Sequence, residues 1–234
     1  MPALPKEKIK ALFSELKGFI QGIEDTHLKG VLERFYENKE FVEVFKKAPA
    51  ARKHHHNYIG GLLEHTVNVA RLCDTISRFY SLDRDLLITG ALLHDLGKTK
   101  EYSLKASVDV TDEGRFIGHL PLTAEMVGKE MGEINDFPQT TKLKIIHMLL
   151  SHHGELEFGS PKEPGFPEAM ALFHADYMDA YVKNVLQEIE GAGEEEPWIF
   201  SRSMGRFIHT GKRPENHIKE ESRKSVRENE GRHR

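Results

Sequence analysis

Apolar residues recur at helical spacing over most of the chain. Between Ile59 and Tyr80 they step by three and four positions, so they share one face of a helix, and His65 lies on that face. Similar patterns predict helices before and after this segment. The predicted helices cover residues 6–20, 27–38, 39–47, 59–80, 84–96, 140–153 and 169–180, with another that begins at His119.

The helix that follows Asp83 carries two adjacent polar residues near its end. Asp83 is a suitable N-cap, and Gly97 is expected to end the helix just after His94 and Asp95. Neighbouring residues on an ideal helix point about 100° apart. Both side chains can therefore reach one centre only at a helix end or a distorted turn, which Gly97 is expected to supply.

One segment has the alternation of a β-hairpin. Residues 108–110 and 115–117 are predicted as strands, and residues 111–114 between them as the turn. Helical patterns dominate the remaining chain. The predicted fold class is therefore all-α, a helical bundle with one small β-hairpin.

Composition adds three limits. The net charge of −4 does not indicate a nucleic-acid-binding protein, although a locally basic cleft remains open. No segment approaches the ~20 apolar residues that span a bilayer, and residues 1–10 lack the apolar run of a signal peptide. Cys73, the single cysteine, is expected to be a buried, inert thiol. A cytoplasmic protein without a membrane segment is expected.

The chain is predicted to have three parts. Residues 1–49 form an N-terminal helical extension, residues 50–210 form the principal domain, and residues 211–234 form a charged tail. The tail has eight basic and five acidic residues, and we interpret it as a solvated segment rather than an RNA-binding arm.

Histidine is the residue type whose distribution indicates function. The chain has 14 histidines, and five segments place a histidine or an aspartate where the helical pattern predicts burial. These segments contain His65, His94 with Asp95, His119, His152 with His153, and Asp176. Buried charge is costly unless it is paired or bound to a metal. A shared metal centre inside the bundle explains all five segments together.

Simpler interpretations compete for each position. His94 could complement the dipole at a helix C-terminus, and the set as a whole could form a buried polar network without metal. At least one of His152 and His153 is expected to face solvent at the end of its helix.

Imidazole and carboxylate donors together suit Mn, Fe, Co, Ni or Zn better than Ca or Mg, and Mn²⁺ is the expected ion.

The motifs around these residues resemble those of the HD phosphohydrolase superfamily. The segment from Leu92 to Lys98 resembles the His-Asp motif of that superfamily, and the order of the other candidate ligands matches as well. Within it, residues 60–66, 82–87 and 152–161 resemble the HD domain of YhaM-type 3′-5′ exoribonucleases, and the likeness extends over roughly residues 38–208. The principal domain is thus identified as an HD domain.

The resemblance implies specific roles. The ligands of a first metal would be His65, His94, Asp95 and Asp176. A second ion would take His119 and His152 or His153, with Asp95 as the bridge. One or two divalent ions are expected. Lys98 would hold a phosphate oxygen, unless it is an ordinary surface lysine, and Asp179 would orient a ligand or the attacking water. His55 and His56 are candidates for substrate contact, whereas His54 is read as a polar loop residue.

The implied activity is metal-assisted hydrolysis of a phosphoester, in which the metal lowers the pKa of bound water. The expected substrate is a nucleotide or the 3′ end of a short single-stranded nucleic acid. YhaM-type exoribonucleases carry an N-terminal OB-fold, whereas about 50 N-terminal residues here are predicted as helices. Alternatives are an HD-type di-iron oxygenase and a nucleotide-binding module without turnover. The sequence leaves a homo-oligomer open.

Overall fold

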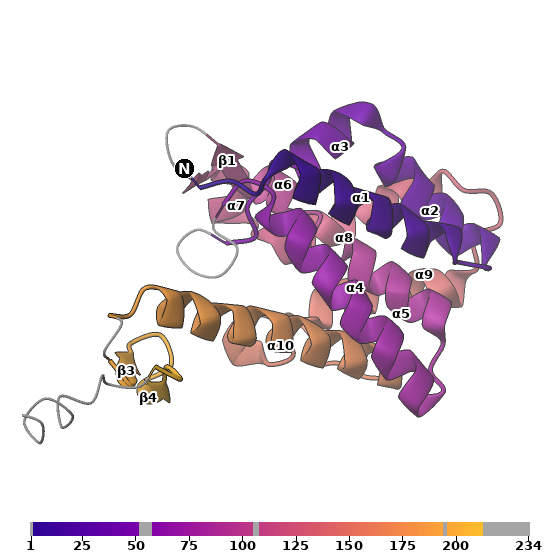
Figure 1. The fold of residues 1–234 in the computed structure, drawn as a ribbon. Coiled ribbons are helices and arrows are strands. Elements are labelled where there is room, and N and C mark those ends of the chain that lie inside the picture. Colours follow the sequence, from indigo (N-terminus) through magenta and orange to yellow (C-terminus); the bar gives the residue numbers. More distant parts are fainter. Residues whose placement is uncertain (1, 52–57, 105–107, 194–195, 213–234) are drawn as a thin grey trace, which may run out of the picture. The chain divides into compact units, whose positions relative to one another are not determined.

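Helices make up most of the residues that the computed structural model describes, which are 2–51, 58–104, 108–193 and 196–212. Figure 1 shows their arrangement. The helices are α1 Lys6–Gln21, α2 Thr26–Tyr36, α3 Lys39–Phe45, α4 Gly61–Tyr80, α5 Arg84–Leu93, α6 Lys98–Glu101, α7 Asp112–Phe116, α8 His119–Gly132, α9 Gln139–Ser151, the 3-10 helix η1 Leu156–Phe158, and α10 Pro167–Glu190. The all-α fold class is confirmed.

Side-chain caps fix where several helices begin. Asp25 accepts hydrogen bonds from two backbone N–H groups at the start of α2, and Asn38 does the same at the start of α3. Asp83 accepts one from Leu86 N at 3.0 Å, as its position in the sequence predicts. The long amphipathic pattern before it becomes α4, which begins two residues later than predicted.

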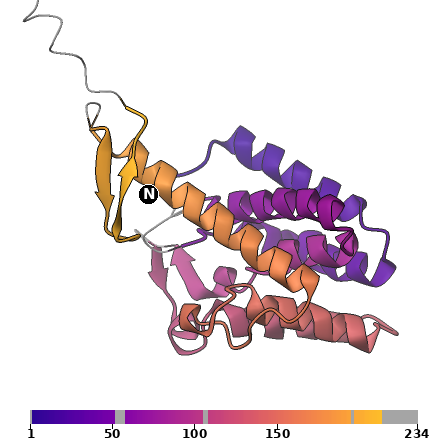
Figure 2. The ribbon, with the colours of Figure 1, turned by 90° about the horizontal axis from the view of Figure 1, so that it is seen from below.

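Two helices form the centre of the bundle. α4 packs along α5, and α1 and α2 cover them on one side (Figures 1 and 2). Every residue of α5 from Leu86 to Leu93 is buried, so this helix is held on all sides. The Tyr36 hydroxyl of α2 donates to Leu92 O at 2.5 Å, which satisfies a backbone carbonyl in the last turn of α5.

The predicted hairpin is wrong in its second strand. Strand β2, Val108–Val110, pairs antiparallel with β1, Tyr102–Leu104, which precedes it in the sequence. The segment predicted as the other strand belongs largely to α7. Thr111 caps that helix by accepting from Gly114 N at 3.0 Å, and this local hydrogen bond favours a helical turn over a hairpin turn.

The described part of the chain divides into two compact units, with the boundary between Lys183 and Asn184. In the second unit, β3 Trp198–Ser201 and β4 Arg206–His209 form another antiparallel pair. The sequence analysis predicted no strands there. Ser201 Oγ donates to Glu188 at 3.0 Å, which ties this pair to the end of α10.

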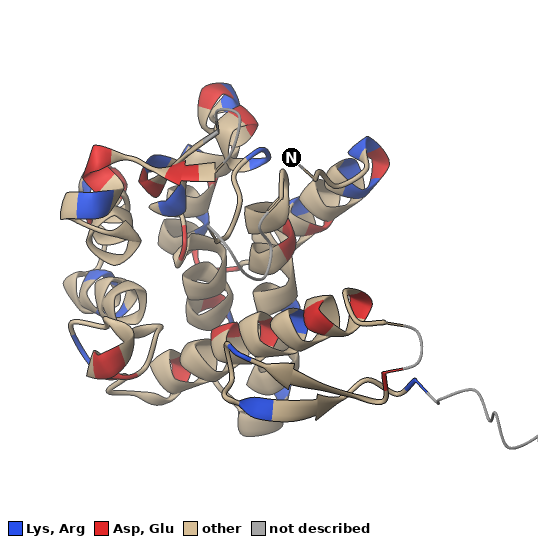
Figure 3. Ribbon diagram, turned by 90° about the vertical axis from the view of Figure 1, so that its left-hand side faces the viewer, with Lys and Arg blue, Asp and Glu red and all other residues tan. Residues whose placement is uncertain are grey.

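Two expectations from composition can be compared with the structure. None of the helices among the described residues is long and apolar enough to span a bilayer. Cys73 is fully buried in the core, and burial raises the pKa of its thiol far above the usual range, so it stays protonated. Both acidic and basic residues lie on the helices seen in Figure 3.

Candidate metal centre

The chain turns sharply after α5, and this turn carries the His-Asp pair. α5 ends at Leu93, so His94 and Asp95 lie in the connection to α6 rather than within a helix that continues to Gly97. The pair therefore occupies the helix end that joint access to one centre requires. The predicted end of this helix was three residues too late.

Gly97 has a different role from the predicted helix terminator. Its φ of −60° is helical, so it needs no left-handed conformation. A Cβ at this position would lie 2.3 Å from His119 O and 2.8 Å from Thr123 N. Gly97 N also donates to Thr123 Oγ1 at 2.8 Å. The missing side chain lets the turn touch the first turn of α8, which brings Asp95 close to His119.

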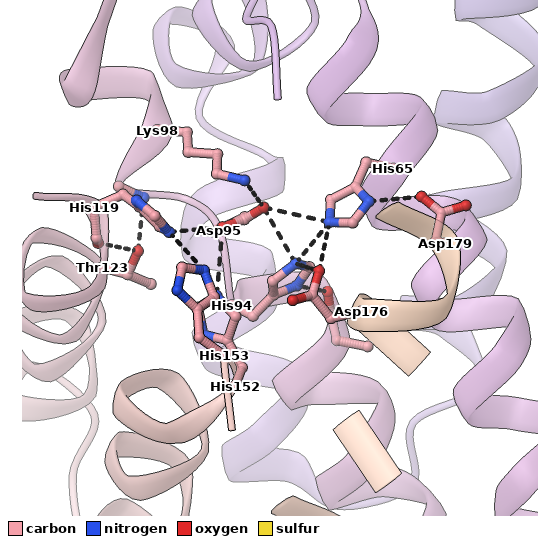
Figure 4. Close-up of polar contacts among 12 residues, drawn as sticks. His65, His94, Asp95, Lys98, His119, Thr123, His152, His153, Asp176 and Asp179 are labelled. Carbon is pink, nitrogen blue, oxygen red and sulfur yellow. Dashed lines mark hydrogen bonds and ion pairs between the residues drawn. The ribbon is translucent and has the colours of Figure 1, made fainter. Parts of the chain in front are cut away.

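The first cluster consists of His65 from α4, His94 and Asp95 from the turn, and Asp176 from α10 (Figure 4). His65 Nε2 lies 3.2 Å from His94 Nε2 and 3.0 Å from Asp176 Oδ1. Asp95 Oδ2 is 3.4 Å from His65 Nε2 and 3.3 Å from His94 Nε2. Four potential ligand atoms thus converge on one point.

The second cluster consists of His119 at the start of α8 and of His152 and His153 at the end of α9. His119 Nε2 lies 3.2 Å from His153 Nε2. The ligand atoms of the three histidines all lie within 4.8 Å of one another. His152 is fully buried, whereas His153 is half-buried and retains partial contact with solvent, and both belong to the cluster.

Asp95 joins the two clusters. Its Oδ2 faces the first, whereas its Oδ1 lies 3.6 Å from His119 Nε2 and 3.6 Å from His152 Nε2. Lys98 Nζ is 2.6 Å from Oδ2. Burial alone would raise the pKa of the Asp95 carboxyl, but the positive charge of the adjacent Lys98 holds it well below its usual range. The bridging residue is therefore ionised.

All five histidines are oriented in the same way. Each Nδ1 lies within hydrogen-bond distance of an oxygen acceptor, and each Nε2 points into a cluster. The acceptors are Asp179 Oδ2 for His65 (2.7 Å), Ala91 O for His94 (2.8 Å), Glu101 Oε2 for His119 (3.1 Å), Leu149 O for His152 (2.9 Å) and Phe158 O for His153 (3.1 Å). A neutral imidazole that donates from Nδ1 keeps a lone pair on Nε2. This is the arrangement of metal-binding histidines.

The two clusters fit divalent metal ions. Lone pairs that face each other at 3.2 Å repel unless a cation or a proton lies between them. Among the described residues, His152 Nε2 and Asp95 Oδ1 are buried with no hydrogen-bond partner, although buried polar atoms normally have one. Mixed nitrogen and carboxylate donors suit Mn, Fe, Co, Ni or Zn.

The protonation of two histidines also fits metal binding. Burial lowers the pKa of His94. Burial, and then the neighbouring charges of His152 and His119, lowers the pKa of His153 to about 3. Both imidazoles are therefore neutral near pH 7, as a metal ligand must be.

All seven residues expected to bind metal converge in the structure, and Lys98 lies beside them, buried rather than at the surface. Asp179 stands behind His65 rather than in the cluster. His55 and His56 lie outside the described residues.

Sequence reasoning missed Glu101, whose carboxylate faces His119, and Asn68, which donates to Asp179 at 2.9 Å. Asn68 lies three positions after His65, so helical spacing could have identified it.

A pocket of about 430 Å³ opens onto the two clusters. Its polar lining includes Lys98, His119, His153 and Asp176, so residues of both clusters face the same space. Metal ions held there would be accessible to a ligand.

Two known family models match parts of this chain. The model of the HD domain matches residues 62–181, just over half of the chain, and this span includes every residue of both clusters. A second model, TraI_2, whose description refers to a helicase, matches residues 8–87, about a third of the chain.

Several curated relatives are named 3′-5′ exoribonuclease YhaM. The chain is 42% identical to the protein of Listeria welshimeri over 153 residues, which cover 64% of this chain and 48% of the relative. It is 39% identical to the Bacillus subtilis protein over 160 residues (68% and 50%) and 40% identical to the Bacillus pumilus protein over 172 residues (72% and 54%). The chain thus spans about half the length of these relatives.

No solved structure gives a significant match. The family model nevertheless covers more than half of the chain and contains the His-Asp turn together with all the other candidate ligands. The chain therefore belongs to the HD-domain family, and with it to the phosphohydrolase superfamily that its motifs resemble.

Proposed function

We propose that this protein is a metal-dependent phosphodiesterase that removes nucleotides from the 3′ end of single-stranded RNA. The observation that carries the proposal is Asp95, whose two carboxylate oxygens face two separate clusters of histidine Nε2 atoms. A shared carboxylate between two metal sites is typical of enzymes that cleave phosphoesters. The names of the curated relatives support RNA as the substrate.

Two ions would be held by different residues. His65, His94, Asp95 and Asp176 would bind the first, and His119, His152, His153 and Asp95 the second. When bound, such ions lower the pKa of water toward neutrality and neutralise charge on the phosphoryl oxygens. The pocket, which residues of both clusters line, would give a phosphodiester access to both positions.

Other residues would orient the substrate and the ligands. Lys98 lines the pocket with its ammonium group beside Asp95, where it can donate to a non-bridging phosphate oxygen. Asp179 Oδ2 lies 2.7 Å from His65 Nδ1 and Glu101 Oε2 lies 3.1 Å from His119 Nδ1. These two carboxylates would hold the rings in the orientation that aims Nε2 at the metal.

The test is cleavage of a 5′-labelled single-stranded RNA with Mn²⁺, with chelator, and with the Asp95→Asn variant. A ladder that shortens from the 3′ end, requires metal and is lost in Asp95→Asn is expected. Asp109→Asn is the matched control, because Asp109 lies on β2 with its side chain about half exposed and paired with Arg115. Metal-loaded protein that binds RNA but never cleaves it would overturn the proposal, as would iron-dependent oxygen consumption without phosphoester cleavage.

A further inference from the structure

One side of the pocket above the metal centre is lined with aromatic rings. Phe173, Tyr177 and Tyr181 follow one another every four residues along α10, so they lie on one side of that helix. Phe158 from η1 lies beside them. We call these four residues the aromatic wall.

The rings of the aromatic wall form a partly stacked series. The centroids of Tyr177 and Tyr181 are 4.5 Å apart with an interplanar angle of 27°. Phe158 and Tyr177 are 6.4 Å apart at 22°, and Phe173 and Tyr177 are 6.0 Å apart at 57°. Several ring planes are therefore close to parallel, which is suited to another flat ring.

The aromatic wall is not simply part of the core. Phe158 is 52% exposed and Tyr177 is 39% exposed, although both line a pocket. Grouped rings that remain open to solvent in a concave site mark a ligand surface more often than a packing defect.

The position of the wall links it to the reactive centre. Tyr177 directly follows Asp176, a candidate ligand of the first metal, and both line the same pocket as Lys98. A ligand in this pocket would thus meet cationic and candidate metal-binding groups as well as uncharged aromatic rings. A phosphate joined to a flat base has this combination of properties.

We propose that the aromatic wall is a base-stacking subsite, which holds a nucleobase next to the phosphodiester being cleaved. The inference rests on the proposed function and narrows its substrate to strands with unpaired, stackable bases. None of the four side chains carries a charge, and only the two tyrosine hydroxyls can form hydrogen bonds, so stacking dominates recognition. Such recognition tolerates all four bases, as is common for stacking platforms on single strands.

The test compares RNA with the same RNA in which the 3′-terminal nucleotides lack bases. For Tyr177→Leu and Tyr181→Leu, kcat/KM on ordinary RNA is expected to fall roughly 10- to 100-fold, the loss of a stacked base. On abasic RNA the wild-type protein already lacks this contribution, so the same substitutions should cause less than about a twofold further loss. Tyr177→Phe retains the ring and should retain most of the activity.

A binding measurement separates this inference from the proposed function. RNA with a 3′-terminal 2-aminopurine is bound to the Asp95→Asn protein, which does not cleave it, and the fluorescence of the base is followed. Quenching that is relieved by Tyr177→Leu supports stacking, even if no metal supports cleavage. If RNA binds with equal fluorescence in both proteins, the proposed base-stacking role of the aromatic wall is wrong, even if wild-type protein degrades RNA.

A matched control excludes a general effect of removing an aromatic ring. Phe116 of α7 is 89% exposed and does not line the pocket, so Phe116→Leu should alter neither the fluorescence nor kcat/KM. Thermal unfolding of each variant by circular dichroism establishes that it is folded. A folded Tyr177→Leu, Tyr181→Leu double variant with wild-type kcat/KM on ordinary RNA would contradict the inference.

Discussion

The first and second clusters share Asp95, yet the protein holds them differently. In the first, His65 and Asp176 lie within the long helices α4 and α10, and His94 and Asp95 lie at the end of α5. In the second, the three histidines stand at helix ends. Ligands fixed within packed helices keep their geometry better than ligands at helix ends.

The side chains that lie near the Nδ1 atoms of His65 and His119 also support the first cluster more strongly than the second. Behind His65, Asp179 accepts from Asn68, whose Oδ1 in turn accepts from Arg71 Nη1 at 3.0 Å. Arg71 pairs with Glu15 of α1, so four side chains support one ring. Behind His119 there is a single carboxylate, that of Glu101, from the short helix α6. We therefore expect the first cluster to retain its ion and the second to exchange its ion with solvent.

The largest effect is expected from Asp95→Asn, because Asp95 faces both clusters. Metal binding should weaken at both, which removes the difference in ion retention between them. The amide keeps the size of the side chain but loses the charge and one oxygen ligand. Loss of activity should exceed the roughly 10- to 100-fold that outer-shell changes cause. Metal analysis after dialysis should give less than one ion per chain, and retention of two ions would show that Asp95 does not bridge.

The next test separates the clusters by removing one histidine from each. His65→Ala should abolish tight metal binding, because the first cluster then lacks a ligand from its most strongly supported position. His153→Ala should leave one tightly bound ion and raise only the Mn²⁺ concentration needed for activity. Metal titration followed by calorimetry distinguishes the two, and the reverse order of severity would contradict the comparison.

The centre was partly predictable from the sequence because two of its candidate ligands lie within regular helices. His65 and Asp176 stand at apolar-face positions, and helical spacing alone predicts their burial. The contact of Gly97 with His119 joins residues from separate elements, and no local pattern specifies it. Glu101 was missed for the same reason. The hairpin was misassigned because Thr111 can serve as either a turn residue or a cap, and the helix cap prevailed.

A smaller effect is expected when the supporting carboxylates are changed to amides. Asp179→Asn should weaken metal binding at the first cluster, and Glu101→Gln should weaken it at the second, each by roughly 10- to 100-fold. The substitutions are chemically matched, so their separate effects on the tight and the exchangeable ion sharpen the comparison. If both variants weaken the same ion, the assignment of one support to each cluster is wrong.

Gly97→Ala tests whether the approach of the turn to α8 holds the clusters together. The new Cβ would meet backbone atoms of α8 that cannot move aside freely, so overpacking should cost about 1–3 kcal/mol of unfolding free energy. Gly132→Ala, at the end of the same helix, meets nothing within 4 Å and should be neutral or stabilising. Urea unfolding measures both, and equal stability of the two variants would refute this role for Gly97.

The smallest effect is expected from Arg71→Met. This substitution removes the ion pair with Glu15, through which the side chains behind His65 contact α1. Arg71 and Glu15 are both more than a third exposed, and exposed ion pairs contribute only about 0–1 kcal/mol. Metal affinity at the first cluster should therefore change less than about fivefold. Arg78→Met is the matched control, because Arg78 also lies on α4 and pairs with Asp74 but does not connect to His65. A much larger loss for Arg71→Met than for Arg78→Met, measured by metal titration, would mean that α1 controls the orientation of His65. The N-terminal helices would then be part of the metal centre rather than a cover over the bundle.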